Sequence, residues 1–287
     1  MNRRQFAATA AAALAAPKAR AQAAPLTAQQ YIDRITAKMA AAKNSSPAGA
    51  QFKRDTIKAG DPATPITGIA TTFMATLDVL QRAHKAGRNF VISHEPTFWH
   101  DPEPMPELAA DPLTLTKRGF IEKNKMVVWR SHDQMHGLRP DPIFLGWAKA
   151  LAWEKYRDAA DPRCYTLPAT TVNAVAQHHA TKLKTKSARL IGDPNLKVTK
   201  VAQGGHGLEE NMRLLAKSDL IIVFEARERD TAEYVRDLVA SGAPKAMLLC
   251  AHLSGEEAGM DEFASWLRTI IKEVTVEYIP AGDHFQI

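Results

Sequence analysis

Three apolar, strand-like runs in this chain end in side chains that could bind metal or move protons. In chain order these are His94 and Glu95 within VISHEPTFWH, His132, Asp133 and His136 within SHDQMHG, and His252 and Glu256 within CAHLSGEEAGM. Burying such groups is costly unless hydrogen bonds or a metal ion replace the lost water. Imidazole and carboxylate together suit zinc, iron or manganese, and carboxylates can bridge two ions.

Each of these signals, taken singly, has an ordinary structural explanation. A strand-end histidine such as His94 more often bonds to the backbone than to a metal, and a lone Asp133 suits a turn or cap. By the same reasoning, four further histidines are assigned to surface or loop positions: His100, His178, His179 and His206. Three clusters in one chain carry more weight, because the carboxyl ends of strands in an open α/β sheet form one ligand-binding edge.

Alternating strand and helix patterns lead to these ends. Helical spacing predicts helices over 28–42, 76–87, 112–124, 208–218, 231–242 and 259–273, and apolar runs predict strands over 68–74, 90–95, 126–133, 219–225, 245–252 and 274–282. This alternation predicts an α/β fold, with two facing lobes of mixed sheets and a metal cleft between them. The expected lobes are 26–156 and 187–287, joined by a Pro- and Thr-containing junction at 157–186.

The first 23 residues read as an export signal. They have a basic start, a short apolar run from Phe6 to Ala16, and small residues at Ala19 and Ala21 or at Ala21 and Ala23. Arg3 and Arg4 resemble the twin-arginine signal, which exports folded proteins from the bacterial cytoplasm. An Ala-rich amphipathic helix that stays attached is the alternative. We therefore expect a periplasmic or secreted protein with no integral membrane segment in the mature chain.

Charge and cysteine content exclude several classes of protein. The net charge is +6, but without the four basic residues of the signal 33 basic and 31 acidic residues remain, so the mature chain carries +2 and no nucleic-acid partner is expected. Cys164 and Cys250 are too few for a disulfide framework and too isolated for a thiolate metal site. Whether these two cysteines pair is left open.

The three clusters lie in blocks that resemble the Nif-three-like dinuclear metal-centre family, whose members are often described as homologues of GTP cyclohydrolase I type 2. The blocks are, in this order, GDPATPITGIATTFMATLDVLQRAHKAGRNFVISHEPTFW, IEKNKMVVWRSHDQMHGLRPDPIFLGWAKAL and LLCAHLSGEEAGMDEFASWL, and the resemblance extends roughly from Ala59 to Trp266. The resemblance implies two α/β lobes assembled as a toroidal homohexamer.

The resemblance also implies a set of metal ligands. The family's positions fall on His94, Glu95, Asp133, His252 and Glu256, which would hold two divalent ions (Fe, Mn, Zn or Mg). Glu95 departs from the family, which has a histidine there. An anionic ligand in place of a neutral one favours harder ions. It could also weaken or empty one metal site, in which case His136 becomes a substitute ligand, and His132 also flanks the position.

Two divalent ions can lower the pKa of a water molecule and stabilise an oxyanion, which is the basis of metal-assisted hydrolysis. We therefore expect an exported metal-dependent hydrolase of an unidentified small molecule, with Glu95 or His136 as ligand or general base. The loop from Thr97 to Thr116 would shape the substrate pocket through Phe98, Trp99 and His100. The alternatives are a metal-binding or metal-delivery protein without turnover, and a structural oligomer with a vestigial site.

Overall fold

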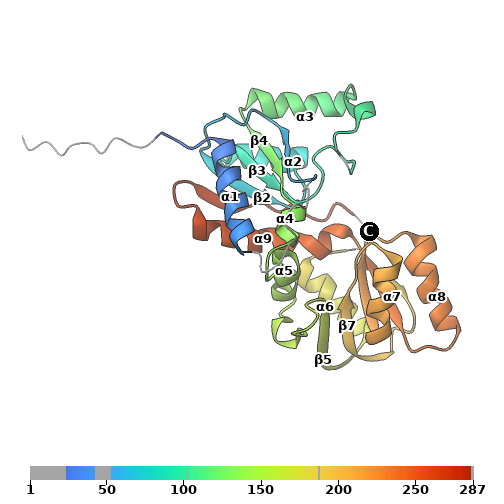
Figure 1. Ribbon diagram of the computed structural model, residues 1–287. Coiled ribbons are helices and arrows are strands. Elements are labelled where there is room, and N and C mark those ends of the chain that lie inside the picture. Colours follow the sequence, from blue (N-terminus) through green and yellow to red (C-terminus); the bar gives the residue numbers. More distant parts are fainter. Residues whose placement is uncertain (1–23, 43–52, 102, 187, 286–287) are drawn as a thin grey trace, which may run out of the picture.

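Two five-stranded mixed sheets form the framework of the computed structural model, which describes residues 24–42, 53–101, 103–186 and 188–285 (Figure 1). The first sheet has the order β1-β4-β3-β2-β10. Its strands are β1 (Ile57–Ala59), β2 (Gly68–Thr72), β3 (Phe90–Ser93), β4 (Val127–Arg130) and β10 (Thr275–Tyr278). Only β1 is antiparallel to its neighbour.

The second sheet has the order β5-β7-β8-β9-β6. Its strands are β5 (Cys164–Thr171), β6 (Ala188–Ile191), β7 (Lys197–Gln203), β8 (Leu220–Phe224) and β9 (Ala246–Cys250). The three central strands are parallel and the two edge strands antiparallel. Strands β8 and β9 are buried along their whole length, as expected for parallel strands covered on both faces. The predicted α/β architecture with mixed sheets is therefore confirmed.

Helices cover both sheets. They are α1 (Ala28–Ala42), α2 (Leu77–Lys85), α3 (Pro112–Lys123), α4 (Asp133–His136), α5 (Pro142–Ala150), α6 (Val172–Leu183), α7 (Leu208–Lys217), α8 (Glu233–Ala240) and α9 (His252–Ile270). Short helical turns occur at η1 (Pro106–Leu108), η2 (Glu154–Tyr156) and the π-helical η3 (Glu228–Ala232). Side chains of Thr76, Asp111, Asp141 and Thr171 cap the backbone N–H groups that begin α2, α3, α5 and α6. No helix in the described ranges is long and apolar enough to cross a bilayer.

The expected division into lobes differs from the observed connections. Residues 164–183 were expected within a junction, but they form β5 and α6, which belong to the second sheet and its core. The C-terminal strand β10 returns to the first sheet and pairs with β2. The chain therefore crosses between the lobes more than once. The predicted signal segment 1–23 lies outside the described residues.

Helices α5 and α9 pack closely at the junction of the two lobes (Figure 1). Two glycines permit this approach. A Cβ atom on Gly146 would lie 2.4 Å from the carbonyl oxygen of Ala258, and one on Gly259 would lie 2.5 Å from Cα of Ile143. Both neighbours are backbone atoms that cannot swing away. The crossing therefore fixes α9, which carries His252 and Glu256, relative to the first lobe.

Candidate metal centre

The register between β3 and β4 brings two of the predicted site segments together. Ser93 pairs with Arg130 in parallel, so His94 and the segment that begins at Ser131 leave the sheet side by side. Nδ1 of His94 lies 3.3 Å from the carbonyl oxygen of Ser131. The imidazole of His94 is fully buried.

The carboxylate of Asp55 holds the segment that carries His132 and His136. Asp55 accepts hydrogen bonds from the backbone N–H groups of His132, Asp133 and Gln134, at 2.6, 3.0 and 2.8 Å. These groups begin α4, so Asp55 acts as its cap. His132 and His136 then lie one helical turn apart, with their rings 4.8 Å apart.

The second lobe supplies the other half of the site in a similar way. Phe224 of β8 pairs with Cys250 of β9, which places Glu225 beside the start of α9. Glu225 has a left-handed backbone conformation (φ 56°), unusual for a residue other than glycine, and its Oε2 lies 2.6 Å from Nδ1 of His252. Glu256 follows one turn later on α9.

Side chains from both lobes converge to form one cluster of possible metal ligands. Their ligand atoms form three overlapping groups, each with mutual distances within 4.8 Å: His94, His132 and His136; His206, His252 and Glu256; His94, Glu95 and Glu256. Oε2 of Glu256 lies 3.3 Å from Nε2 of His94 and 3.0 Å from Nε2 of His252. Glu256 therefore joins the two halves of the cluster.

Every histidine of this cluster has its Nδ1 directed at an oxygen that can only accept at neutral pH, including His206, whose Nδ1 lies 3.4 Å from the carbonyl oxygen of Glu225. The other pairs are His94 with the Ser131 carbonyl, His132 with Asp133 at 3.0 Å, His136 with Asp141 at 2.9 Å, and His252 with Glu225. Nδ1 must therefore donate, and in the neutral ring Nε2 carries a lone pair. Metal-binding histidines are oriented in this way by carboxylates and carbonyls.

In the neutral rings these lone pairs face one another and the carboxylate directly. Nε2 of His94, Nε2 of His252 and Oε2 of Glu256 are buried and have no hydrogen-bond partner among the described residues. Two lone pairs at 3.0 Å repel each other unless a proton or a cation lies between them. A metal ion satisfies several such atoms at once, and the residues therefore fit a divalent metal.

The electrostatics of the cluster favour added positive charge. Burial alone would lower the pKa of His252, but its contacts with Glu225 and Glu256 raise it to about 10. Burial would raise the pKa of Glu95, but His132 and the charges of His94 and His252 lower it to about 2. Burial also opposes ionisation of Glu256, yet His252 and His94 hold its pKa well below the usual range. Both carboxylates are therefore ionised at neutral pH.

The structure brings most of the predicted ligands together, and one stands apart. His94, Glu95, His252 and Glu256 all belong to the converging groups, as do the flanking His132 and His136. Asp133 belongs to none of them. Its Oδ1 accepts hydrogen bonds from Nη1 of Arg54 and Nδ1 of His132, both at 3.0 Å. Asp133 as a metal ligand stays a prediction, for which this geometry offers no support.

Of the four histidines expected in surface or loop positions, His206 is found in an exposed loop as expected, but it also joins the cluster, whereas His179 is buried. His206 is exposed but lies over His252, with ring centroids 4.6 Å apart, and belongs to one converging group. His179 is buried beside Cys250 in the second core, where burial lowers its pKa to about 4, so a surface position for it was wrong. His179 lies in α6, which covers the second sheet. Cys164 and Cys250 are both free thiols.

Sequence reasoning missed the residues that hold the ligands. The buried Arg130 contacts Oε2 of Glu95 at 3.1 Å and was not predicted as part of the site. Asp141 and Glu225, which orient His136 and His252, were not predicted either. Arg130 and Glu225 stand at or just after strand ends, as His94 and His132 do, so the same rule could have found them. Asp141 precedes Pro142, a usual start of a helix.

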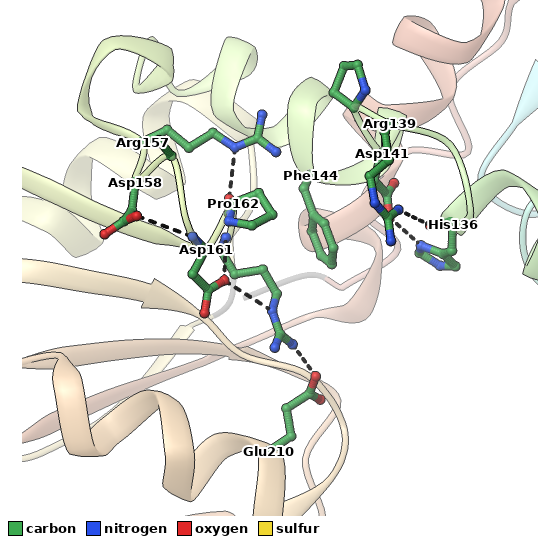
Figure 2. Close-up of a pocket in the computed structure, with 12 residues that line it drawn as sticks. His136, Arg139, Asp141, Phe144, Arg157, Asp158, Asp161, Pro162 and Glu210 are labelled. Atoms are coloured by element: carbon green, nitrogen blue, oxygen red, sulfur yellow. Dashed lines mark hydrogen bonds and ion pairs between the residues drawn. The ribbon is translucent and has the colours of Figure 1, made fainter. Parts of the chain in front are cut away.

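A cavity of about 820 Å³ adjoins the cluster between the lobes. Its wall includes His136 and Asp141, and in Figure 2 Phe144 stands between these two and the segment of Asp161 and Pro162. The residues predicted to line a pocket lie elsewhere. Phe98 is buried in the core, Trp99 is 45% exposed and His100 is exposed, and none of the three lines this cavity.

The fold and site together define a two-lobed α/β protein with a histidine and carboxylate cluster between the lobes. The chain belongs to the Duf34/NIF3 (NGG1p interacting factor 3) family, whose model matches residues 28–282. This confirms the resemblance seen in the sequence. No curated protein matches the sequence significantly.

Solved structures share the fold at low sequence identity. The Staphylococcus aureus protein SA1388 has a TM-score of 0.70 and 16% identity, covering 92% of this chain and 99% of that chain. A Bacillus cereus protein related to NIF3 has a TM-score of 0.66 and 13% identity, covering 91% and 99%. Reduced HcgD from Methanocaldococcus jannaschii has a TM-score of 0.60 and 15% identity, covering 88% and 97%.

Proposed function

We propose that this protein is an exported hydrolase that depends on divalent metal ions held between its two lobes. The observation that carries the proposal is the set of buried Nε2 and Oε2 atoms of His94, His252 and Glu256, which face one another and have no hydrogen-bond partner among the described residues. Glu95, His132 and His136 complete the set of converging donors. Divalent ions at this position would activate a water molecule and neutralise the negative charge that develops on a substrate.

The protein's own residues orient the ligands and bind substrate. Burial opposes ionisation of Glu95, but His132, His94 and His252 lower its pKa to about 2, so an ionised carboxylate is available as a ligand. His136 faces the cavity and is held by Asp141 through Nδ1. Among the described residues, neither Arg139 nor Arg157 of the cavity wall forms an ion pair. Both guanidinium groups donate to backbone carbonyls instead, and a substrate that carries a carboxylate or phosphate could still pair with their charge.

The cavity is the feature that favours turnover over the alternative, a protein that only binds or delivers metal. A storage or structural site is closed by protein ligands, whereas a catalytic site borders a space that holds substrate. Here His136 lies both in the ligand cluster and in the cavity wall.

The experiment is a hydrolysis screen of the mature protein with Zn²⁺, Mn²⁺, Fe²⁺ or Mg²⁺, against anionic esters, phosphate esters and cyclic amides. We expect activity that a chelator removes and added metal restores. Glu256→Gln should lose on the order of 100-fold in rate, because a donor shared by two of the three converging groups is gone. His84→Gln, on the exposed face of α2, is the matched control. A protein that binds metal fully yet hydrolyses no substrate would support metal delivery instead.

We also propose that the protein assembles as a homohexamer. This proposal rests on the resemblance to the family. Light scattering of the mature chain should give a mass near six subunits. A monomer at micromolar concentration would refute the assembly.

A further inference from the structure

One of the three converging groups consists of imidazoles alone. His94 and His132 are stacked with ring centroids 4.4 Å apart, and His136 lies edge-on to both, at 5.0 and 4.8 Å. The three residues come from the end of β3 and from the two ends of α4. Their ligand atoms lie within 4.8 Å of one another, close enough to share one ion.

Asp133 lies outside this group, and contacts with Arg54 and His132 keep its carboxylate away from the cluster. Its Oδ1 accepts from Nη1 of Arg54 and from Nδ1 of His132, and its Oδ2 lies 3.5 Å from the backbone nitrogen of Arg54. The same carboxylate cannot turn toward the cluster without giving up both contacts. Its neighbour His132 occupies the position facing Glu95 instead, with Nε2 3.5 Å from Oε1.

Asp133 is also part of a closed ring of six ionisable side chains. In order around the ring these are Glu95, Arg130, Asp101, Arg54, Asp133 and His132, with successive contacts of 3.1, 3.1, 2.7, 3.0 and 3.0 Å, and 3.5 Å from His132 back to Glu95. Acidic and basic side chains alternate around this ring. The ring fixes Asp133 and Glu95 on opposite sides of His132.

We propose that His94, His132 and His136 form an all-imidazole site for one metal ion, and that Asp133 is a positioning residue for His132 rather than a ligand. This inference rests on the proposed metal centre and specifies its two halves. The second ion then belongs to the half formed by His252 and Glu256, where a carboxylate takes part. Three neutral nitrogen donors select Zn²⁺, Co²⁺, Ni²⁺ or Cu²⁺ over Mg²⁺ and Mn²⁺.

The test is a count of bound ions on the full-length mature protein, stripped of metal and titrated with Zn²⁺. We expect His132→Gln and His136→Gln each to lose one equivalent and keep the other. Asp133→Asn should keep both equivalents, with affinity for one reduced about 10- to 100-fold, because a partner that orients a ligand is weakened. His84→Gln should match the wild type. Circular dichroism and thermal unfolding of the metal-free variants exclude misfolding as the cause.

A spectroscopic measurement gives a second readout. Pulsed electron paramagnetic resonance of Cu²⁺ in the protein detects the remote nitrogens of coordinated imidazoles. We expect a signal from three coordinated imidazoles in the wild type and in Asp133→Asn, and the loss of that signal in His132→Gln.

The outcomes separate the two claims. If the wild type binds no divalent ion, the metal-dependent function fails as a whole. If the wild type binds two ions but His132→Gln and His136→Gln keep both, only the all-imidazole site is overturned. If Asp133→Asn loses a full equivalent, Asp133 is a ligand and its assignment as a positioning residue is wrong.

Discussion

Nδ1 of His252 lies 2.6 Å from Oε2 of Glu225, so a residue at the end of β8 orients a histidine at the start of α9. Replacement of Glu225 by Ala should weaken metal binding about 10- to 100-fold, because the ring loses the acceptor that fixes its tautomer. Affinity measured by competition with a chromophoric chelator checks this. Glu209→Ala, which removes an exposed carboxylate paired with Arg213, is the control. Equal affinity in both variants would show that Glu225 does not orient His252.

The crossing of α5 and α9 should be intolerant of added volume. In Gly259→Ala the new methyl group would lie 2.5 Å from Cα of Ile143, so the helices must separate. We expect a loss of about 1–3 kcal/mol in the free energy of unfolding, measured with urea, and weaker metal binding. Gly119→Ala is the matched control, because Gly119 lies in α3 with open space around it and its replacement should stabilise by up to about 1 kcal/mol. Equal effects of the two substitutions would contradict the close crossing.

Lys117 should make stability depend on pH in the alkaline range. It is 2% exposed, its ammonium donates to the carbonyl of Thr97, and burial lowers its pKa to about 8. Between this value and the ordinary pKa of lysine, the unfolded chain binds more protons, so the folded state gains stability as pH rises. Relative to Lys117→Met, the wild type should gain on the order of 3 kcal/mol between pH 7 and pH 10.5. A stability difference between the two proteins that is independent of pH would contradict the buried cation.

The elements that carry the site could be predicted from the sequence, because β3, β4 and β9 are short apolar runs bounded by turn signals and polar groups. Family resemblance pointed to His94, His252 and Glu256, which do converge. The roles of Asp133 and His132 could not be predicted, since they depend on Arg54, a residue nearly 80 positions earlier that reaches Asp133 only in the folded protein. Local spacing carries no information about such a partner.

The pairing of β10 with the first sheet could not be predicted from the sequence either. Its four residues have ordinary strand character, and only pairing with β2 reveals the lobe to which they belong. The segment at 164–183 looked like a junction because β5 has exposed and partly exposed positions along its length. An edge strand with one solvated face lacks the continuous apolar run of a central strand.

The proposed export can be tested independently of the site. If Arg3 and Arg4 form a twin-arginine signal, changing both to lysine should leave uncleaved precursor in the cytoplasm, because lysine lacks the planar guanidinium group. Cell fractionation and the mass of the chain check this. Unchanged export and cleavage of the double variant would remove the twin-arginine assignment.

Metal content is the most direct test of the proposed metal centre. The mature protein, purified without chelators and dialysed, should contain about two divalent ions per chain by elemental analysis, and Glu256→Gln, which removes the donor nearest both His94 and His252, should contain far less. A wild-type protein that stays free of metal after incubation with Zn²⁺, Mn²⁺ and Fe²⁺ would contradict the central claim that this buried cluster is a metal centre.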